Sequence, residues 1–441
     1  MKKKNKQTKK KFTTKAVTNT LGPLSSLDDP QIVHMLIRLC ASYCRVVHLL
    51  RAVPPMFAQA AIAEFDCAVQ KALAHGVGVL FTESALLQLR LPLVLGGAGL
   101  RRAAEHSAGA YLASVMRAGE ADNWPAHSAA GFSQAVKELC ARSGMCAAVV
   151  CDPASPRTQR FFSESVDKFC FAALLADAPL RDKARLLSVS GKGAGAWLGV
   201  IPSESLGYTF SPREFSVLLR WWCGMNVFDA VFACPGCGAA MDQAGYHALT
   251  CRHLGGTFVI RHNALRETFL HFLSLAGIPA EREAPSLLPG SAARPADIFV
   301  PNFAGTQAAC LDFAVTHTQQ SNILHCARFG EECKAAGLLL VPMVVEVFGR
   351  WGERSAEAMK LATKGCANRA SERVAFAGAH VRRSLSVTLQ RLNARILLAR
   401  MNPAAEVFAD PVRTPQPDRE LWPFVDDLAD VCEVALPPGE P

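Results

Sequence analysis

The sequence contains no apolar run long enough to cross a bilayer. The most apolar stretch, Ala335 to Phe348, is interrupted by Pro342 and Glu346, whereas a membrane-spanning helix needs about 20 apolar residues. No apolar core of the kind found in signal peptides follows the N-terminal lysines, because FTTKAVTNT comes next. We therefore expect a soluble, intracellular protein that does not contact membranes.

Several motifs of nucleotide chemistry are also missing. There is no lysine of the Walker type, and the glycines of GKGAGAW imitate a dinucleotide fingerprint without the surrounding strand–helix–strand unit. No polymerase palm pattern precedes residue 234. The FVDD segment at residues 424–427 resembles a polymerase aspartate pair, but it lies outside any palm-like pattern. We interpret it as the start of a helix.

Acidic residues are absent before Asp28, which makes the N-terminus strongly basic. The 441-residue chain has a formal charge of +9. Eight lysines fall within residues 1–20, so the rest of the chain carries only about +1. Such a polar tail is expected to be disordered. It is either a nuclear-import or phosphate-contacting arm or simply a solvated terminus.

The sixteen cysteines do not form the pattern of a secreted disulfide scaffold, because they are spread over a long chain. Most of them lie in apolar surroundings, and we predict that these are small buried residues. Examples are Cys40, Cys44, Cys170 and Cys310. Lone histidines on apolar helices, such as His34 and His48, are likewise predicted to be core residues. Only the cysteines of residues 234–251 have the spacing of metal ligands.

The overall pattern predicts an α+β protein. A mostly helical N-terminal region precedes a small zinc knuckle, and an α/β domain with a mixed sheet follows. HNALRETFLHFLSLAGI is an amphipathic helix that Gly277 can end, ADIFV and CLDFAV form a hairpin around Gly305, and LLLVPMVVEVF is a buried strand. The predicted parts are a basic tail (1–20), a helical region (21–225), the knuckle (226–256), the sheet domain (257–365) and a C-terminal helix with a loose tail (366–441).

Residues 234–251, CPGCGAAMDQAGYHALTC, hold the most specific local motif. Zinc prefers four tetrahedral thiolate and imidazole ligands, and a CxxC turn brings two sulfurs to one ion with little strain. We therefore predict structural zinc bound by Cys234, Cys237, His247 and Cys251, with His253 as a possible substitute ligand. The alternative is that two chance cysteines lie in a chain rich in cysteine.

Acidic residues follow the knuckle at positions that suit a second metal. Asp297 begins one predicted strand and Asp312 lies within the next, so the hairpin can bring both carboxylates to one edge of the sheet. Two hard oxygen ligands suit Mg²⁺, which can activate water and neutralise charge during phosphodiester hydrolysis. Without a family comparison, the favoured interpretation is that these acids beside turns are simply solvated or capping side chains.

In chain order, the knuckle, RHN (261–263), EAPSL (283–287), RPAD (294–297) and LDFAV (311–315) resemble the restriction-like endonuclease region of site-specific non-LTR retrotransposons. The resemblance covers residues 230–352, including VEVFGRWG. It implies a truncated element that lacks the reverse transcriptase palm. In that family a zinc knuckle leads into a nuclease of the PD-(D/E)xK type, which nicks target DNA with Mg²⁺ or Mn²⁺. DNA is therefore the implied partner, with RNA as an alternative, and the nucleus is the implied location.

The resemblance assigns roles to individual residues. Asp297 and Asp312 would bind the catalytic metal, Glu283 would be an auxiliary acid, and His262 and Asn263 would support the helix that leads into the nuclease.

Two departures from the family pattern concern the predicted nuclease centre. Ala296 separates the proline from Asp297, and Ala314 stands where such nucleases often hold lysine. A cation on the next helix would then be required to balance charge at the phosphate. The candidates there are Arg328 and Lys334, while His325 occupies the register of the family's lysine and Phe329 that of a tyrosine.

Two hypotheses follow from the sequence. The first is a metal-dependent DNA endonuclease that nicks DNA through Asp297 and Asp312. The second is a zinc-containing nucleic-acid-binding module whose nuclease centre has decayed, as Ala314 and His325 suggest. In the second, the tail and four arginines of the late basic helix would contact phosphates. These are Arg382, Arg383, Arg391 and Arg395. That helix could also be a solvated face packed by its leucines.

Overall fold

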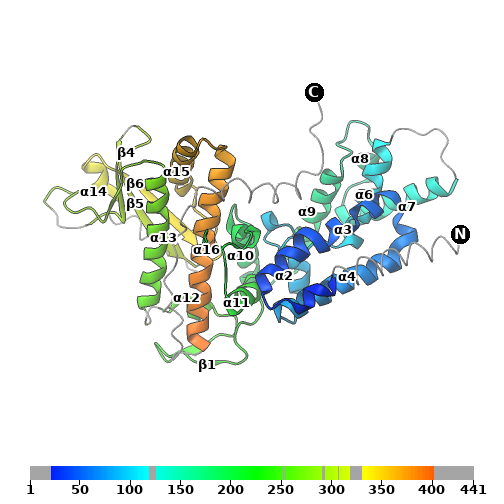
Figure 1. Cartoon of the computed structure of the whole chain (residues 1–441), viewed down its shortest axis with the longest axis horizontal. Coiled ribbons are helices and arrows are strands. Elements are labelled where there is room, and N and C mark those ends of the chain that lie inside the picture. The colour runs from blue at the N-terminus through cyan, green and yellow to red at the C-terminus, as the bar shows by residue number, and fades with distance from the viewer. Residues whose placement is uncertain are drawn as a thin grey trace. The chain divides into compact units, whose positions relative to one another are not determined.

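The computed structural model describes residues 21–118, 126–251, 253, 255–290, 294–305, 307–317 and 330–401 (Figure 1). The basic tail, the segment with His325, Arg328 and Phe329, and the FVDD segment lie outside these residues. The chain divides into two compact units, Met1–Lys183 and Ala184–Pro441. The predicted helical region of residues 21–225 therefore spans parts of both units.

Within the described residues, the first unit is built from helices alone. They are η3 (Pro23–Ser26), α2 (Pro30–Leu36), η4 (Ile37–Ala41), α3 (Tyr43–Ala52), α4 (Pro55–Val77), α5 (Glu83–Leu89), η5 (Leu93–Leu95), α6 (Ala103–Arg117), α7 (Ala126–Ser143), α8 (Ala147–Cys151) and α9 (Gln159–Asp177). The predicted start of α2 is confirmed, because the Asp29 carboxylate accepts hydrogen bonds from Gln31 N and Ile32 N. A further helix, α10 (Leu180–Val189), crosses the boundary between the units.

The core of the first unit forms where α6 packs on its neighbours. Val46, Ile62 and Phe65 pack with Ala103 at one end of α6, and a second cluster joins α6 to α7 and α9. By length and composition alone, Pro30–Ala52 could cross a membrane. Its segments α2, η4 and α3 each bury some apolar side chains, and 33% of the apolar window is buried, so the expectation of no segment of membrane-spanning length does not hold for Pro30–Ala52.

The second unit contains helices and two small sheets. Its helices are η6 (Ala194–Gly199), α11 (Pro212–Trp222), α12 (Tyr246–Thr250), α13 (Gly255–Leu275), α14 (Gly330–Ala335), α15 (Ser355–Ala370) and α16 (Val374–Met401). Its strands are β1 (Phe232–Ala233), β2 (Ala240–Met241), β3 (Glu281–Arg282), β4 (Ile298–Phe303), β5 (Gln307–Thr316) and β6 (Leu339–Glu346). Helices and mixed strands together confirm the predicted α+β class.

The larger sheet has the strand order β3-β4-β5-β6. β3, β4 and β5 pair antiparallel, whereas β5 and β6 pair parallel. The predicted hairpin around Gly305 is β4–β5, and the predicted buried strand is β6. Both predictions are confirmed. The predicted helix is α13, which ends at Leu275, and Gly277 follows it with a positive φ of 68°.

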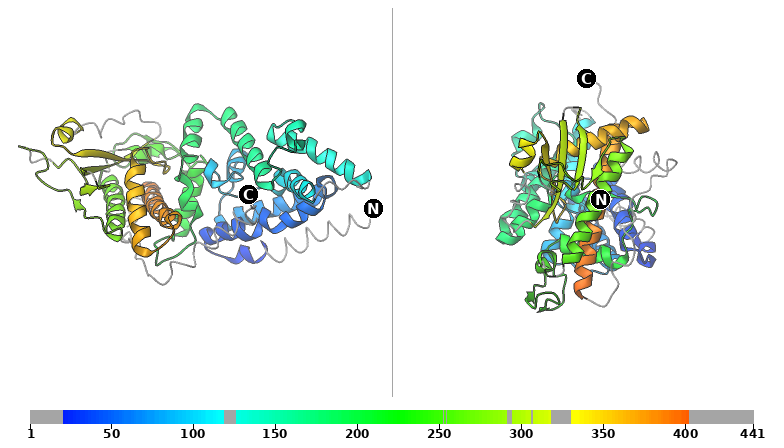
Figure 2. Two further views of the ribbon diagram at one scale, coloured as in Figure 1. Left: turned by 90° about the horizontal axis from the view of Figure 1, so that it is seen from above. Right: turned by 90° about the vertical axis from the view of Figure 1, so that its left-hand side faces the viewer.

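Helices cover both faces of this sheet (Figure 2). On one face, apolar residues of β4, β5 and β6 pack against α13, α15 and α16, which contribute Phe269, Ala362 and Leu389 among others. On the other face, Cys310 of β5 packs with Cys333 of α14. In β6, Val341, Met343 and Val345 are buried and the residues between them are half-buried, so neither face of this apolar strand is fully exposed.

Helix α16 is the central helix of the second unit. It packs against η6, α11, α12, α13 and α15. Several of its polar residues are buried and bonded to other elements. Arg391 donates to Thr209 O at 2.9 Å, Asn393 donates to Val347 O at 2.7 Å, and Arg395 donates to Glu214 Oε1 at 2.9 Å. The predicted phosphate contacts of Arg391 and Arg395 are therefore wrong, because both guanidinium groups serve the interior of the fold.

The glycine-rich segment GKGAGAW belongs to the same core. Trp197 in η6 is buried, and its ring packs edge-on against Phe210, Phe215 and Trp222. Trp221 stacks on Phe348, with ring centroids 3.9 Å apart. These aromatic contacts explain why residues 184–225 pack with the second unit.

Predictions for isolated cysteines and histidines had mixed outcomes. Cys310 is buried as expected, whereas Cys40 is exposed. His34 is a bonded core residue, with Nε2 at 3.1 Å from Ala98 O, but His48 is exposed. The helical pattern identifies an apolar face without fixing which of its edge residues is covered.

Candidate metal centres

A short hairpin positions the first two ligands of the knuckle. β1 and β2 pair antiparallel, with Ala233 opposite Ala240. Immediately beyond this pair, Cys234 N donates to Ala239 O at 2.7 Å, and Gly238 N donates to Cys234 O at 2.8 Å. Gly238 has a φ of 73°, a backbone conformation that residues other than glycine rarely adopt. The tight turn thereby places Cys234 and Cys237 beside each other.

Helix α12 supplies the other two ligands. His247 lies in its first turn, and Cys251 follows its last residue, so the spacing of four places both on one face. The Asp242 carboxylate accepts hydrogen bonds from Tyr246 N at 3.1 Å and from His247 N at 2.7 Å. It satisfies orphan N–H groups at the start of the helix and fixes the direction in which His247 points.

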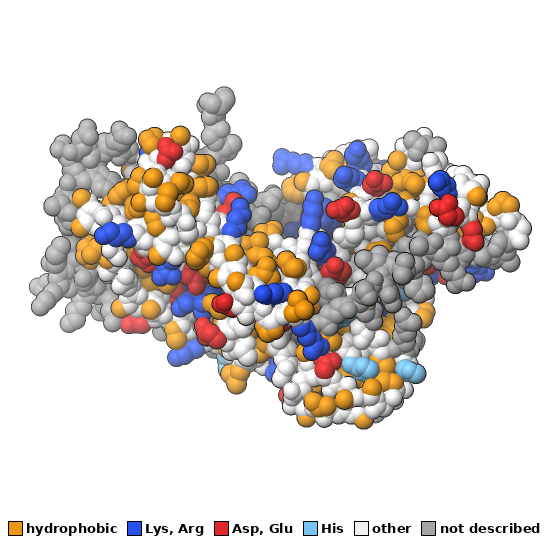
Figure 3. Space-filling view, turned by 180° about the vertical axis from the view of Figure 1, so that it is seen from behind, with side chains coloured by type: hydrophobic (Ala, Val, Ile, Leu, Met, Phe, Trp, Pro, Cys, Tyr) orange, Lys and Arg blue, Asp and Glu red, His pale blue; other side chains and the backbone are white. Residues whose placement is uncertain are grey.

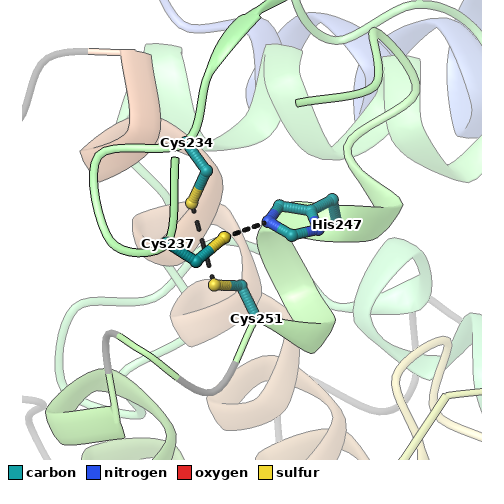
Figure 4. Close-up of side chains that lie close together, drawn as sticks. All are labelled: Cys234, Cys237, His247 and Cys251. Carbon is teal, nitrogen blue, oxygen red and sulfur yellow. Dashed lines mark hydrogen bonds between the residues drawn. The ribbon is translucent and has the colours of Figure 1, made fainter. Parts of the chain in front are cut away.

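The four side chains converge on one point (Figure 4). Their ligand atoms all lie within 4.8 Å of one another. Cys234 Sγ lies 3.7 Å from Cys251 Sγ, and Cys237 Sγ lies 3.2 Å from His247 Nε2. Two sulfurs about 2.3 Å from a tetrahedral zinc ion would be separated by about 3.8 Å. The predicted ligand set therefore has the size and shape that zinc requires, and it could hold a zinc ion.

Local electrostatics favour a thiolate at this cluster. Burial acts to raise the pKa of Cys234, but hydrogen bonds from the backbone N–H groups of Cys237 and Gly236 outweigh it and lower the pKa to about 6. Burial raises the pKa of Cys251. The lowered pKa of Cys234 favours its thiolate, which is the form that binds zinc.

Glu283 directly follows β3, Asp297 directly precedes β4, and Asp312 lies within β5 of the larger sheet. Arg282 pairs with Ile298, and Ile298 pairs with Leu311, so the three acids occupy adjacent positions across β3, β4 and β5. Glu283 N donates to Asp297 O at 3.0 Å. The predicted hairpin therefore brings Asp297 and Asp312 next to each other in the backbone.

Asp297 is bonded to β5 and to α13. Asp297 N donates to Leu311 O at 3.0 Å, and Leu311 also pairs with the next residue, Ile298. Asp297 lies directly before β4, and the register shift of the β4–β5 pair falls farther along, between Val300 and Phe303. The Asp297 carboxylate accepts from Phe313 N at 2.6 Å and lies 3.0 Å from His262 Nε2 on α13.

His262 therefore holds Asp297 in place. Its Nε2 also lies 3.1 Å from Phe313 O, which can only accept. Nε2 must carry the proton and donate to both oxygens. The hydrogen bond to Asp297 is also the main reason why the pKa of His262 is raised. The sequence predicted only that His262 supports the helix, because the RHN motif does not show that the histidine side chain contacts Asp297.

Asp312 and Glu283 have different surroundings. Asp312 lies between Leu311 and Phe313, which face α13, and it interacts electrostatically with Cys310 and Cys333 on the α14 side. Glu283 is paired with Arg266 and, at 3.0 Å, with Arg294. These arginines lower the pKa of its carboxyl group, Arg266 most strongly.

The second metal centre is less clearly formed than the knuckle. Within the described ranges, the knuckle is the only group of three or more His, Cys, Asp or Glu side chains whose ligand atoms lie close enough to share an ion. Lys334 is exposed on α14, and Ala314 is half-buried on β5. Arg328 lies outside the described residues. Arg266 is a buried cation near Glu283 that the sequence did not indicate.

Comparisons with known proteins do not identify a family for these sites. No model of a known protein family matches the chain, and no curated protein shows significant similarity to it. The zinc ligand set therefore rests on its own geometry, and the nuclease assignment rests on the order of motifs and the positions of the acids.

Proposed function

We propose that the second unit is a metal-dependent DNA endonuclease of the PD-(D/E)xK type, from a truncated retrotransposon-derived protein that acts in the nucleus. The observation that carries the proposal is the placement of Asp297, directly before β4, next to β5 with Asp312, at a sheet that follows a four-ligand knuckle. The order of helix α13, hairpin β4–β5, helix α14 and strand β6 adds support, because the motif order predicted it.

In this proposal the two aspartates share a divalent ion. Mg²⁺ or Mn²⁺ would activate water and neutralise charge on the scissile phosphate. Asp297 Oδ2 is engaged by Phe313 N and His262, so the contacts fix the carboxylate and leave Oδ1 for an ion. Positive charge at the phosphate would come from Lys334 and from Arg328, which lies outside the described residues. Glu283 would be an auxiliary acid that holds Arg266 and Arg294 near the centre.

A plasmid-nicking assay with Mg²⁺ or Mn²⁺ tests the proposal. The variants are Asp297→Asn and Asp312→Asn, and the matched control is Asp229→Asn, which removes an exposed acid elsewhere in the same unit. The first two variants should lose nicking, and the control should keep it. Equal nicking by all four proteins would refute the catalytic assignment.

A specific surface feature favours the second candidate, a zinc-containing nucleic-acid-binding module. Three exposed cations surround the glycine turn at residues 191–193: Lys192 lies within it, Arg350 packs on Gly191, and Arg382 lies against Gly193. None of the three has an acidic partner within the described chain. On the face drawn in Figure 3, basic side chains are mixed with acidic and apolar ones.

Salt-dependent DNA binding separates this candidate from the first. Each phosphate contact adds about 0.9 to the slope of log K against log salt. Replacing all three cations with glutamine should therefore reduce the slope by nearly 3. The control triple variant replaces exposed lysines of the first unit, namely Lys71, Lys137 and Lys168. An unchanged slope would exclude this surface, and binding without nicking would favour the module over the enzyme.

A further inference from the structure

Arg400 is a buried cation with an incomplete set of partners. It lies in the last turn of α16 and is only 3% exposed. Its Nη2 donates to Ala248 O at 3.4 Å, while its Nε has no hydrogen-bond partner within the described residues. Buried guanidinium groups normally have a carboxylate beside them, because an unpaired buried charge is costly. No ion pair is seen for Arg400 in the part of the chain that the structure describes.

The groups that surround Arg400 are the zinc ligands. Ala248, its hydrogen-bond acceptor, lies in α12 between His247 and Cys251. The thiols that interact electrostatically with its guanidinium are those of Cys234, Cys251 and Cys237.

The same end of α16 packs closely on the knuckle. A Cβ atom added to Gly245, which precedes α12, would lie 2.8 Å from Leu397 Cδ2. Leu397 and Arg400 are three residues apart, so they lie on one face of α16. The close-up of the ligands shows this helix behind them (Figure 4).

The charge of a loaded knuckle explains this placement. A zinc ion with three thiolates and a neutral imidazole carries one net negative charge. Cys234 and Cys251 are buried, so this charge is poorly solvated and requires a cation nearby. Arg400 supplies one positive charge and balances it.

We propose that Arg400 is the charge partner of the zinc site and couples zinc occupancy to the packing of α16. With zinc bound, the guanidinium and the cluster neutralise each other. Without zinc, the guanidinium keeps only its hydrogen bond to Ala248 O within the described residues. Zinc therefore stabilises the C-terminal end of the central helix as well as the knuckle. The proposal does not depend on DNA cleavage.

Zinc affinity tests the proposal directly. The full chain would compete for zinc with a chromophoric chelator, in wild type, Arg400→Met and Arg400→Lys. Partners of metal ligands typically contribute about 10- to 100-fold in affinity. Arg400→Met should therefore bind zinc about 10- to 100-fold more weakly, and Arg400→Lys should fall between it and wild type. Wild-type affinity in Arg400→Met would overturn the proposal.

Stability with and without zinc distinguishes charge pairing from simple packing. Arg400→Met should lower the melting temperature of the zinc-loaded protein more than that of the zinc-free protein, because the guanidinium balances the negative charge of the loaded knuckle. The control is Arg391→Met, a buried arginine of the same helix that bonds to Gly207 O and Thr209 O. It should destabilise both forms and leave zinc affinity unchanged. Equal destabilisation of both forms by Arg400→Met would reduce Arg400 to a packing residue.

Discussion

Asp297 is the residue for which catalytic and structural roles can be separated most sharply. Its Oδ2 accepts from Phe313 N at 2.6 Å, and Phe313 is buried. A hydrogen bond to a charged acceptor contributes about 1.5–3 kcal/mol. The His262 contact adds less, about 0–1 kcal/mol, because the two side chains remain 30% and 16% exposed. Asp297→Ala should therefore cost about 2–3 kcal/mol of stability.

Asp297→Asn should destabilise the protein less than Asp297→Ala does, but the two variants should lose nicking activity to a similar extent. Its amide oxygen can still accept from Phe313 N, and a neutral acceptor retains roughly half the strength of a charged one. The expected cost is about 1 kcal/mol. Nicking should fall in both variants by more than about 100-fold, the upper range for residues that only support a metal ligand.

The assays are urea unfolding of the zinc-loaded chain and plasmid nicking at saturating Mg²⁺. Equal destabilisation by alanine and asparagine would show that the acceptor oxygen does not hold the strand. Wild-type nicking by the asparagine variant would show that Asp297 binds no catalytic metal.

Three further predictions concern stability. Removing zinc with a chelator should lower the melting temperature of the protein without removing a catalytic ion, so nicking by protein that remains folded should persist; an unchanged melting curve would contradict the structural role of zinc. Gly245→Ala should be more destabilising than Gly238→Ala by about 1–3 kcal/mol, because both glycines have positive φ but only Gly245 lacks room beside Leu397; denaturant titration measures the difference. Burial lowers the pKa of His34 to about 3 from its ordinary 6.5, so the unfolded chain takes up the proton first and stability falls as pH drops below 6.5. His34→Gln can still donate to Ala98 O, and it should lose about 2 kcal/mol less than wild type between pH 7 and pH 5, at about 1.4 kcal/mol per pH unit; equal losses would refute a neutral buried His34.

Local patterns were sufficient to predict the elements of the sheet domain. The apolar spacing of Leu265, Phe269 and Phe272 predicts α13, and all three are buried. Gly305 marks the turn between β4 and β5. The four zinc ligands fall within eighteen residues, so a hairpin and one helical turn are enough to bring them together. Periodicity and ligand spacing are short-range properties, and the sequence displays them directly.

Contacts between distant segments could not be predicted in this way. Arg391 and Arg395 look like a basic face in the sequence, yet α16 is surrounded by five elements and its arginines bond to carbonyl and carboxylate groups far away in the chain. The Arg266–Glu283 pair and the Arg400 contact are similar cases. A charged residue is buried when the fold supplies a partner, and that partner is not visible in the local pattern.

The pair of helices α13 and α16 relates the two candidate metal centres to each other. On α13, Arg261 donates to Asn393 of α16 at 2.7 Å, while the next residue, His262, donates to Asp297. On α16, Arg400 reaches the knuckle two turns beyond Asn393. The knuckle and the row of acids therefore share no ligand, but both are attached to the same helix pair. Because close-packed elements transmit strain, loss of zinc can reach Asp297 only by loosening this helix pair, so nicking is lost with the fold and is retained by protein in which α13 and α16 stay packed.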